Sequence, residues 1–178
     1  MSIAVYAFGP CNISINTGTS GAWENLGYTA DGVRVREEAI QLPVPGDENG
    51  GAEGVPIEFQ HLAEQHFLTL ELTRFDTAIL QKLRSRFKSG ITAGMTKSPG
   101  TLVATDYFRV LLQSDTVSGN HRRYLKAYAT QPIEETIGTK YSRPMVVLQC
   151  LPFKYVVSSV NKYAIWDAVT ADDTDPTT

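Results

Sequence analysis

The sequence is poor in the residues that build metal, redox and disulfide sites. Its 178 residues include two cysteines and three histidines. Cys11 and Cys150 stand near opposite ends of the chain, and two isolated cysteines match neither a zinc motif nor a disulfide framework. We expect both to be buried, unbridged thiols, with a single bridge between the first and last strands as the open alternative.

Long apolar runs and a basic excess are also missing. No apolar run reaches the roughly 18 residues that a transmembrane helix needs, and Met1–Pro10 lacks the basic residues and apolar core of a signal peptide. We therefore expect no membrane partner. Sixteen Lys and Arg against 19 Asp and Glu give a net charge of −3, which is unlike proteins that grip nucleic acid phosphates.

The motifs of common enzyme classes do not occur. The chain has no Gly-x-Ser-x-Gly elbow and no phosphate-binding loop that ends in Gly-Lys-Ser/Thr. His61 and His66 stand five residues apart, whereas the zinc motif His-Glu-x-x-His places its imidazoles four apart on a helix. We interpret them as turn or surface histidines that face opposite sides if they lie on a strand. We expect no catalytic residue, metal or cofactor.

What the sequence does contain is alternation of apolar and polar residues. Such a period of two is typical of half-buried strands. It occurs at residues 13–15, 55–59, 68–72, 108–112 and 124–129. The nearly continuous apolar run Pro144–Leu151 predicts a strand buried on both faces. Two segments, 43–54 and 88–100, are predicted to be long loops, because glycine and proline are frequent and large apolar residues scarce.

One segment, about Asp76–Lys88, predicts a helix. Asp76 suits the N-cap position, because its carboxylate can accept the free amide hydrogens of the first turn. Ile79, Leu80 and Leu83 share an apolar face. The basic residues fall mostly on the other side. They form a solvated face, or a contact surface for nucleic acid or for an acidic patch of a neighbouring subunit: Lys82, Arg84, Arg86 and Lys88.

The fold class that follows is mainly β: a β-sandwich or barrel with one packed helix and long loops. We expect one domain over residues 1–165. Residues 166–178 are predicted to be an acidic, flexible C-terminal tail, because Asp172–Thr178 holds three acids and a proline without an apolar anchor.

Two segments together resemble the structural proteins of tailed bacteriophages, and tail tube proteins most closely. The first is Leu26–Val33, Leu-Gly-Tyr-Thr-Ala-Asp-Gly-Val, followed by Arg-Val-Arg. The second runs from Lys126-Ala127-Tyr128 through Ile137-Gly138-Thr139-Lys140 to Leu148–Pro152. The resemblance covers residues 20 to 155, and the Thr101–Ser118 segment and the acidic tail depart from it.

The resemblance implies a subunit of hexameric rings that stack into a DNA-conducting tube. Its partners are then other copies of the chain, other virion proteins and DNA that passes without specific binding. The implied location is the virion, after assembly in the host bacterial cytoplasm. Three glutamates face the lumen or, equally well, solvent: Glu38, Glu58 and Glu71. The segment that reaches the next ring is expected within the first loop: Pro45, Gly46, Asp47, Glu48, Asn49, Gly50 and Gly51.

Two readings from other classes stay open. A capsid cement or decoration protein, or a neck protein that connects head and tail, also uses a β-domain with extended loops. A module that recognises a carbohydrate or host surface is the other reading. The chain has only Trp23 and Trp166, without a visible aromatic platform, which disfavours the module.

Overall fold

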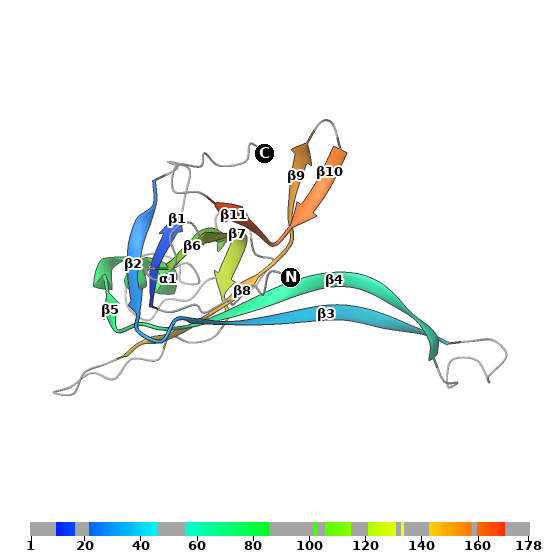
Figure 1. Ribbon diagram of the computed structural model, residues 1–178, viewed down its shortest axis with the longest axis horizontal. Coiled ribbons are helices and arrows are strands. Elements are labelled where there is room, and N and C mark those ends of the chain that lie inside the picture. The colour runs from blue at the N-terminus through cyan, green and yellow to red at the C-terminus, as the bar shows by residue number, and fades with distance from the viewer. Residues whose placement is uncertain are drawn as a thin grey trace, which may run out of the picture.

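The computed structural model describes residues 10–16, 22–45, 56–85, 102, 106–114, 121–130, 133, 143–157 and 160–169. These residues form eleven strands and one helix (Figure 1). The predicted fold class, mainly β with one packed helix, is confirmed. The elements are β1 Cys11–Asn16, β2 Glu24–Thr29, β3 Val33–Pro45, β4 Pro56–Glu71, β5 Arg74–Phe75, α1 Thr77–Ser85, β6 Phe108–Ser114, β7 His121–Ala129, β8 Met145–Cys150, β9 Phe153–Val157, β10 Val160–Ala164 and β11 Trp166–Val169.

Nine of the strands form one antiparallel sheet. Its order is β3-β4-β8-β7-β6-β1-β2-β5, and β11 pairs with β7 beside this path. In Figure 1 the β1, β2 and β6 strands lie above β4 and β8, and buried side chains of both groups belong to one hydrophobic cluster. The sheet therefore curls around its core in a sandwich-like manner, as expected for alternating strands with one apolar face each. A separate two-stranded sheet pairs β9 with β10.

The burial of individual strands follows the alternation only in part, because β1 is buried at four consecutive residues, Ile13–Asn16, and β7 at three, Arg123–Leu125. In β6 every second residue is buried, as predicted. The prediction for β8 was wrong, because Met145 is exposed and Val147 and Gln149 are half-buried, while Val146 and Leu148 are fully buried. One face of β8 packs on the core and the other belongs to the polar surface described below.

The first predicted loop is shorter than its sequence suggests. Pro43–Pro45 continues β3, and residues 56–71 form one uninterrupted strand of 16 residues instead of two strands joined by a turn. The remaining positions of this loop, 46–54, and the whole second loop, 88–100, lie outside the described residues.

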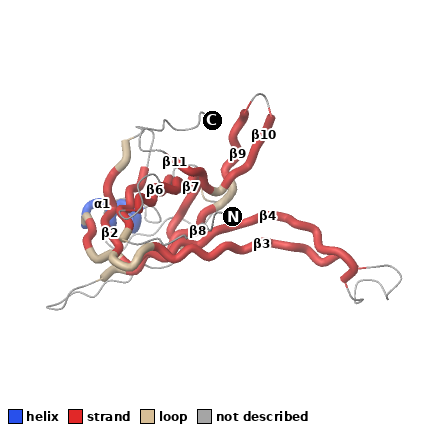
Figure 2. The backbone as a smooth tube through the Cα atoms, in the orientation of Figure 1, coloured by secondary structure: helices blue, strands red, loops and turns tan. Residues whose placement is uncertain are grey.

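The helix begins where the sequence predicts. The Asp76 carboxylate accepts hydrogen bonds from the amides of Ala78 (2.8 Å) and Ile79 (3.2 Å), which is the N-cap arrangement. Ile79, Leu80 and Leu83 are buried in the core. Figure 2 shows the helix at the end of the body opposite to the long β3–β4 hairpin. No helix of the described chain is long and apolar enough to cross a membrane.

The flexible C-terminal tail was predicted to begin at residue 166, which is too early by at least four residues. Trp166–Val169 forms β11, which pairs with β7, so the expected flexible segment from residue 166 is contradicted for these four positions. An ion pair anchors the strand: the Arg123 Nη2 lies 2.5 Å from Asp167 Oδ2, and the Arg123 side chain is buried. Residues 170–178 lie outside the described residues.

The cysteine expectation is confirmed. Cys11 in β1 and Cys150 in β8 are both buried thiols and form no disulfide. Burial raises the pKa of the Cys150 thiol above its ordinary value, because the thiolate would lie in an apolar surrounding.

Candidate functional site: a polar sheet face and a hairpin arm

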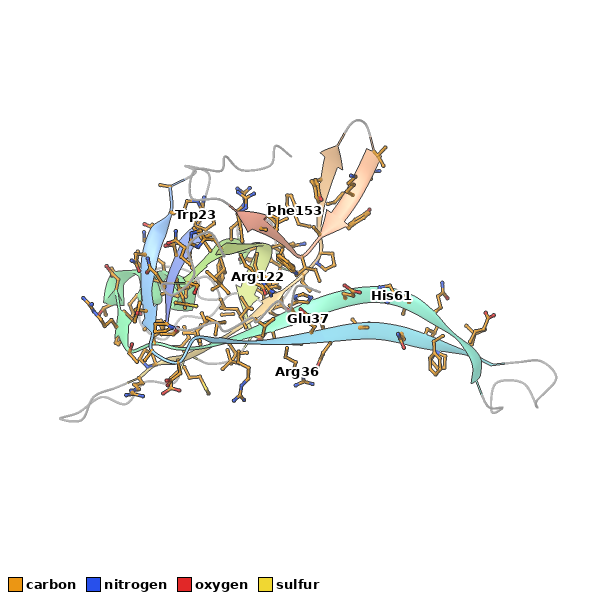
Figure 3. All side chains as sticks on the ribbon, viewed as in Figure 1. Trp23, Arg36, Glu37, His61, Arg122 and Phe153 are labelled. Atoms are coloured by element: carbon orange, nitrogen blue, oxygen red, sulfur yellow. The ribbon has the colours of Figure 1, made fainter. Side chains whose placement is uncertain are left out.

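The strand register places all three predicted glutamates on one face of the sheet. Glu38 stands opposite Gln65, and Glu58 stands opposite Val44, an even number of residues further along β3. Glu71 lies six residues beyond Gln65 in β4, so it shares that face. Figure 3 shows Arg36 on this side, pointing away from the body, and Glu37 on the other. We call this surface of β3, β4, β8 and β7 the polar face.

Four side chains form a continuous hydrogen-bonded ladder across the polar face. The Gln65 amide donates to Glu38 Oε2 over 3.0 Å, and the Gln149 amide donates to Gln65 Oε1 over 2.5 Å. The Tyr128 hydroxyl donates to Gln149 Oε1 over 2.5 Å. The ladder therefore connects β3, β4, β8 and β7 in that order. Each member is partly buried, so the chain of bonds fixes these side chains rather than leaving them free in solvent.

The charges of the polar face are largely compensated near the body. Arg36 forms an ion pair with Glu38 and lies over the Phe67 ring at 6.0 Å from its centroid. Arg143 Nη1 lies 3.4 Å from Glu71 Oε1. Two of the three predicted lumen glutamates thus have a cationic partner in their own chain. Near the body the described surface is therefore polar and close to neutral rather than strongly acidic.

Beyond the ladder, β3 and β4 continue as a free-standing hairpin. We call residues 39–45 and 56–64 the arm. The strand β8 pairs with β4 only from His66 to Glu71, so within the described chain the arm strands pair with each other alone. Figure 1 shows the arm projecting far past the body.

The arm exposes apolar side chains on both of its faces. Ile40 and Leu42 lie on the polar-face side, with Leu42 50% exposed, and Phe59 lies on the opposite side with 63% exposed. Leu62 is 53% exposed at a bulge, where the register shifts between the pairs Ile40–Ala63 and Gln41–His61. Within the part of the chain that the structure describes, this ribbon presents exposed apolar surface together with unpaired strand edges.

A hollow of about 620 Å³ lies where the arm joins the body. It is lined by His61, Glu64 and His66 from β4 and by Tyr163, Ile165 and Trp166 from the chain after β9, among others. Both histidines line it because the extra residue at the bulge changes the alternation between them. The expectation that they face opposite sides was therefore wrong.

His66 is also buried, which contradicts its interpretation as a surface histidine. Its Nδ1 lies 4.0 Å from Glu37 Oε1, and its ring meets the Tyr124 ring edge-on at 6.1 Å between centroids. Burial lowers the pKa of His66, while the negative charges of Glu37 and Glu64 oppose that shift and Arg122 adds to it. Within the described residues no group of His, Cys, Asp and Glu is arranged to hold a metal ion.

The predicted basic helix face is described only in part. Lys82 is about half exposed and forms an ion pair with Glu24 of β2 in the same chain. Arg84 lies in α1, and Arg86 and Lys88 lie outside the described residues. Of the predicted inter-ring segment, Pro45 ends β3, and Gly46, Asp47, Glu48, Asn49, Gly50 and Gly51 lie outside the described residues.

Sequence reasoning missed the ladder and the arm. The ladder glutamines occupy ordinary polar positions of alternating strands, and Gln65 and Gln149 are 84 residues apart, so no local pattern joins them. The arm left a signal, because Ile40, Leu42 and Val44 alternate with Gln41 and prolines. That alternation continues into the predicted loop and identifies a strand.

The fold and site define a mainly-β protein with a polar sheet face and a projecting hairpin. Comparison with protein-family models, with curated proteins and with solved structures finds no match. The resemblance to tail tube proteins therefore stays a prediction from the residues alone.

Proposed function

We propose that the protein is a structural subunit of a bacteriophage tail tube, which assembles into rings, six-membered by the resemblance, that stack into a DNA-conducting tube. The observation that carries the proposal is the arm. A two-stranded ribbon with apolar side chains exposed on both faces is marginally stable alone in water. It gains stability when another surface covers its apolar side chains and strand edges.

The arm suits contact between copies of one chain. Strands that continue from subunit to subunit close a ring and remove the exposed edges of each sheet. A contact between two different patches of identical chains also generates rings or open helical stacks, whereas a contact of one patch with itself stops at a dimer. The arm and the body it would reach are different patches, so their contact belongs to the first kind.

The polar face suits the wall of a channel. DNA that must move through a tube requires a hydrated surface without a basic excess, because Lys and Arg would bind its phosphates. The ladder from Glu38 to Tyr128 provides such a surface, with Arg36 compensated by Glu38. We assign this face to the lumen, with no catalytic, metal or cofactor site required.

Electron microscopy of the purified protein at several concentrations, with light scattering for mass, tests the proposal. Hollow tubes or six-membered rings are the expected result. A small closed oligomer such as a trimer would contradict it and favour a capsid cement or neck protein, with binding to isolated capsids as the next measurement.

Matched variants sharpen the test. Phe59→Ser removes an exposed apolar side chain from the arm, and Met145→Ser removes one from the body, where Met145 is 40% exposed. We expect Phe59→Ser to shift assembled protein to monomer and to leave the melting temperature of the monomer itself unchanged. Met145→Ser is expected to assemble like the wild type. Equal assembly of all three proteins would remove the arm as the basis of the proposal.

A further inference from the structure

Charge is strongly segregated along this chain. Residues 37 to 73 contain eight of the 19 acidic residues and none of the 16 basic ones. The remaining residues therefore hold 16 basic against 11 acidic ones. The described arm shows this directly, because Glu58 and Glu64 are both exposed and no Lys or Arg lies among its residues. The modest net charge of the whole chain conceals an acidic projection on a basic remainder.

A second hairpin carries the opposite charge. The β9–β10 pair forms its own two-stranded sheet and projects from the body (Figure 1). Residues 153–164 contain Lys154 and Lys162, both exposed, and no acidic residue. Val160 is 58% exposed and Tyr163 is 66% exposed. This hairpin therefore combines cations and exposed apolar surface, as the arm combines carboxylates and exposed apolar surface.

The hairpin of the same chain is too short to cover the arm. Its strands have five residues each, or about 17 Å at 3.3 Å per residue. The ten β4 residues from Pro56 to Gln65 span about 33 Å. Within the described chain, residues of both projections line the hollow, with His61 and Glu64 on one side and Tyr163 and Ala164 on the other. The outer arm, with Leu42 and Phe59, extends beyond it.

We infer that the arm of one copy binds the β9–β10 hairpin of a second copy. By register, Glu58 and Glu64 lie on opposite faces of the arm, and Lys154 and Lys162 lie on opposite faces of the hairpin. Side-by-side pairing of the two ribbons then places a carboxylate and an ammonium group on each shared face, next to the exposed apolar side chains of both ribbons. The inference rests on the proposed assembly of identical subunits and names the two surfaces that form the contact. Complementary potentials of this kind select the partner and the register and speed the encounter.

Charge reversal tests the pairing. The arm variant Glu58→Lys/Glu64→Lys and the hairpin variant Lys154→Glu/Lys162→Glu each place like charges opposite one another. Each alone is expected to raise the concentration at which half of the chains associate by at least about tenfold. Mixing the two variants restores unlike charges at every contact, as does combining all four changes in one chain, and both are expected to associate like the wild type.

Arg34→Glu/Arg74→Glu is the matched control, because it makes the same charge change at two exposed positions outside both hairpins. Loss of association in this control equal to that in the hairpin variant, or failure of both rescues, would overturn the inference. Charge pairing also predicts that added salt weakens the association of the wild type. The arm variant and the hairpin variant, each measured alone, should lose less association as salt increases, because salt also screens their like charges.

Photo-crosslinking separates this inference from the proposed function. With p-benzoylphenylalanine in place of Phe59, we expect crosslinked dimers on denaturing gels, with the second site mapped to residues 153–164. Rings or tubes whose crosslinks map elsewhere would overturn the inference, while the proposed function as a tube subunit would still stand. Crosslinks confined to one chain would also overturn it. Crosslinks between copies at 153–164 without rings or tubes would support the contact and count against the tube.

Discussion

At the scale of single residues, the buried histidine at the base of the arm has a defined electrostatic setting. His66 is buried beside Tyr124, and the charged groups that act on it are Glu37, Glu64 and Arg122. Burial favours the neutral imidazole and is the largest of these effects. The folded state therefore binds a proton at this site less readily than the unfolded chain does.

This setting predicts a pH dependence of stability. Because the folded pKa of His66 lies below its ordinary value of 6.5, the unfolded chain binds more protons as the pH falls through 6.5 towards the folded pKa. The contribution of neutral His66 to the free energy of unfolding is present above pH 6.5 and is lost in that window, by at most about 1.4 kcal/mol per pH unit.

His66→Gln is expected to remove this dependence of the unfolding free energy on pH. Urea unfolding between pH 5 and 7.5 measures it, and the exposed His61→Gln serves as the control. Parallel curves for wild type and His66→Gln would contradict the assignment.

The hydrogen-bonded ladder gives a second prediction at this scale. Gln149 donates to Gln65 and accepts from Tyr128, so Gln149→Ala leaves both neighbours without that partner. We expect a loss of about 1–2 kcal/mol in the free energy of unfolding, since water can replace part of the bonds at half-buried positions. Tyr128→Phe removes one bond and is expected to cost about half as much. A double-mutant cycle of the two changes should show coupling, and purely additive effects would mean that the ladder is not cooperative.

At the scale of elements, a glycine explains the close contact between β2 and β5. Gly27 has a φ of 154°, and a Cβ placed there would lie 2.2 Å from the backbone oxygen of Arg74. The two strands pair at this point, with Gly27 opposite Phe75. The side chain must be absent for β5 to approach and for α1 to start where it does.

Gly27→Ala is therefore expected to destabilise the protein by about 2–4 kcal/mol, because backbone atoms must move to admit the methyl group. Gly32 has a φ of 84° in the turn before β3. Gly32→Ala is the comparison, and we expect about 1 kcal/mol for placing alanine in a left-handed conformation without a comparable contact. Thermal unfolding followed by circular dichroism measures both, and a smaller effect at Gly27 than at Gly32 would refute the explanation.

Sequence patterns predicted elements well where each element follows one rule. Alternation identified the core strands, and Asp76 with its apolar face identified the helix. The patterns failed where a second effect interrupts the rule. Pro43 and Pro45 indicated a loop, but at the end of β3 they extend a hairpin whose edge has no described partner strand. The bulge at Leu62 broke the alternation and concealed a 16-residue strand.

The polar face was accessible to sequence analysis only as single residues. That Glu38, Glu58 and Glu71 share one face depends on the register between β3 and β4, which the sequence does not state. The ladder depends in addition on β8 lying next to β4, with residues far apart in the chain. Contacts of this type follow from topology, so no local spacing predicts them.

At the scale of the whole molecule, the chain divides into a body that contains the core and an arm that does not. No described apolar residue between positions 36 and 67 forms or packs against the hydrophobic cluster, although this segment includes most of the longest strand pair. His66 and the ladder mark the boundary. The free energy of folding therefore resides in the body, and the arm serves contacts with another surface.

Removal of the arm tests this division. The pair Glu38–Gln65 is the last before the arm, so replacing residues 39–64 by Asn-Gly joins the shortened strands through a two-residue turn that matches their twist. We expect this chain to keep its β-rich circular dichroism spectrum and to melt within a few degrees of the full chain, because no core side chain is lost. It should remain monomeric at concentrations where the full chain assembles. An arm-deleted chain that fails to fold would show that the hairpin nucleates or supports the sheet. One that still forms rings or tubes would place the contact between subunits on the body.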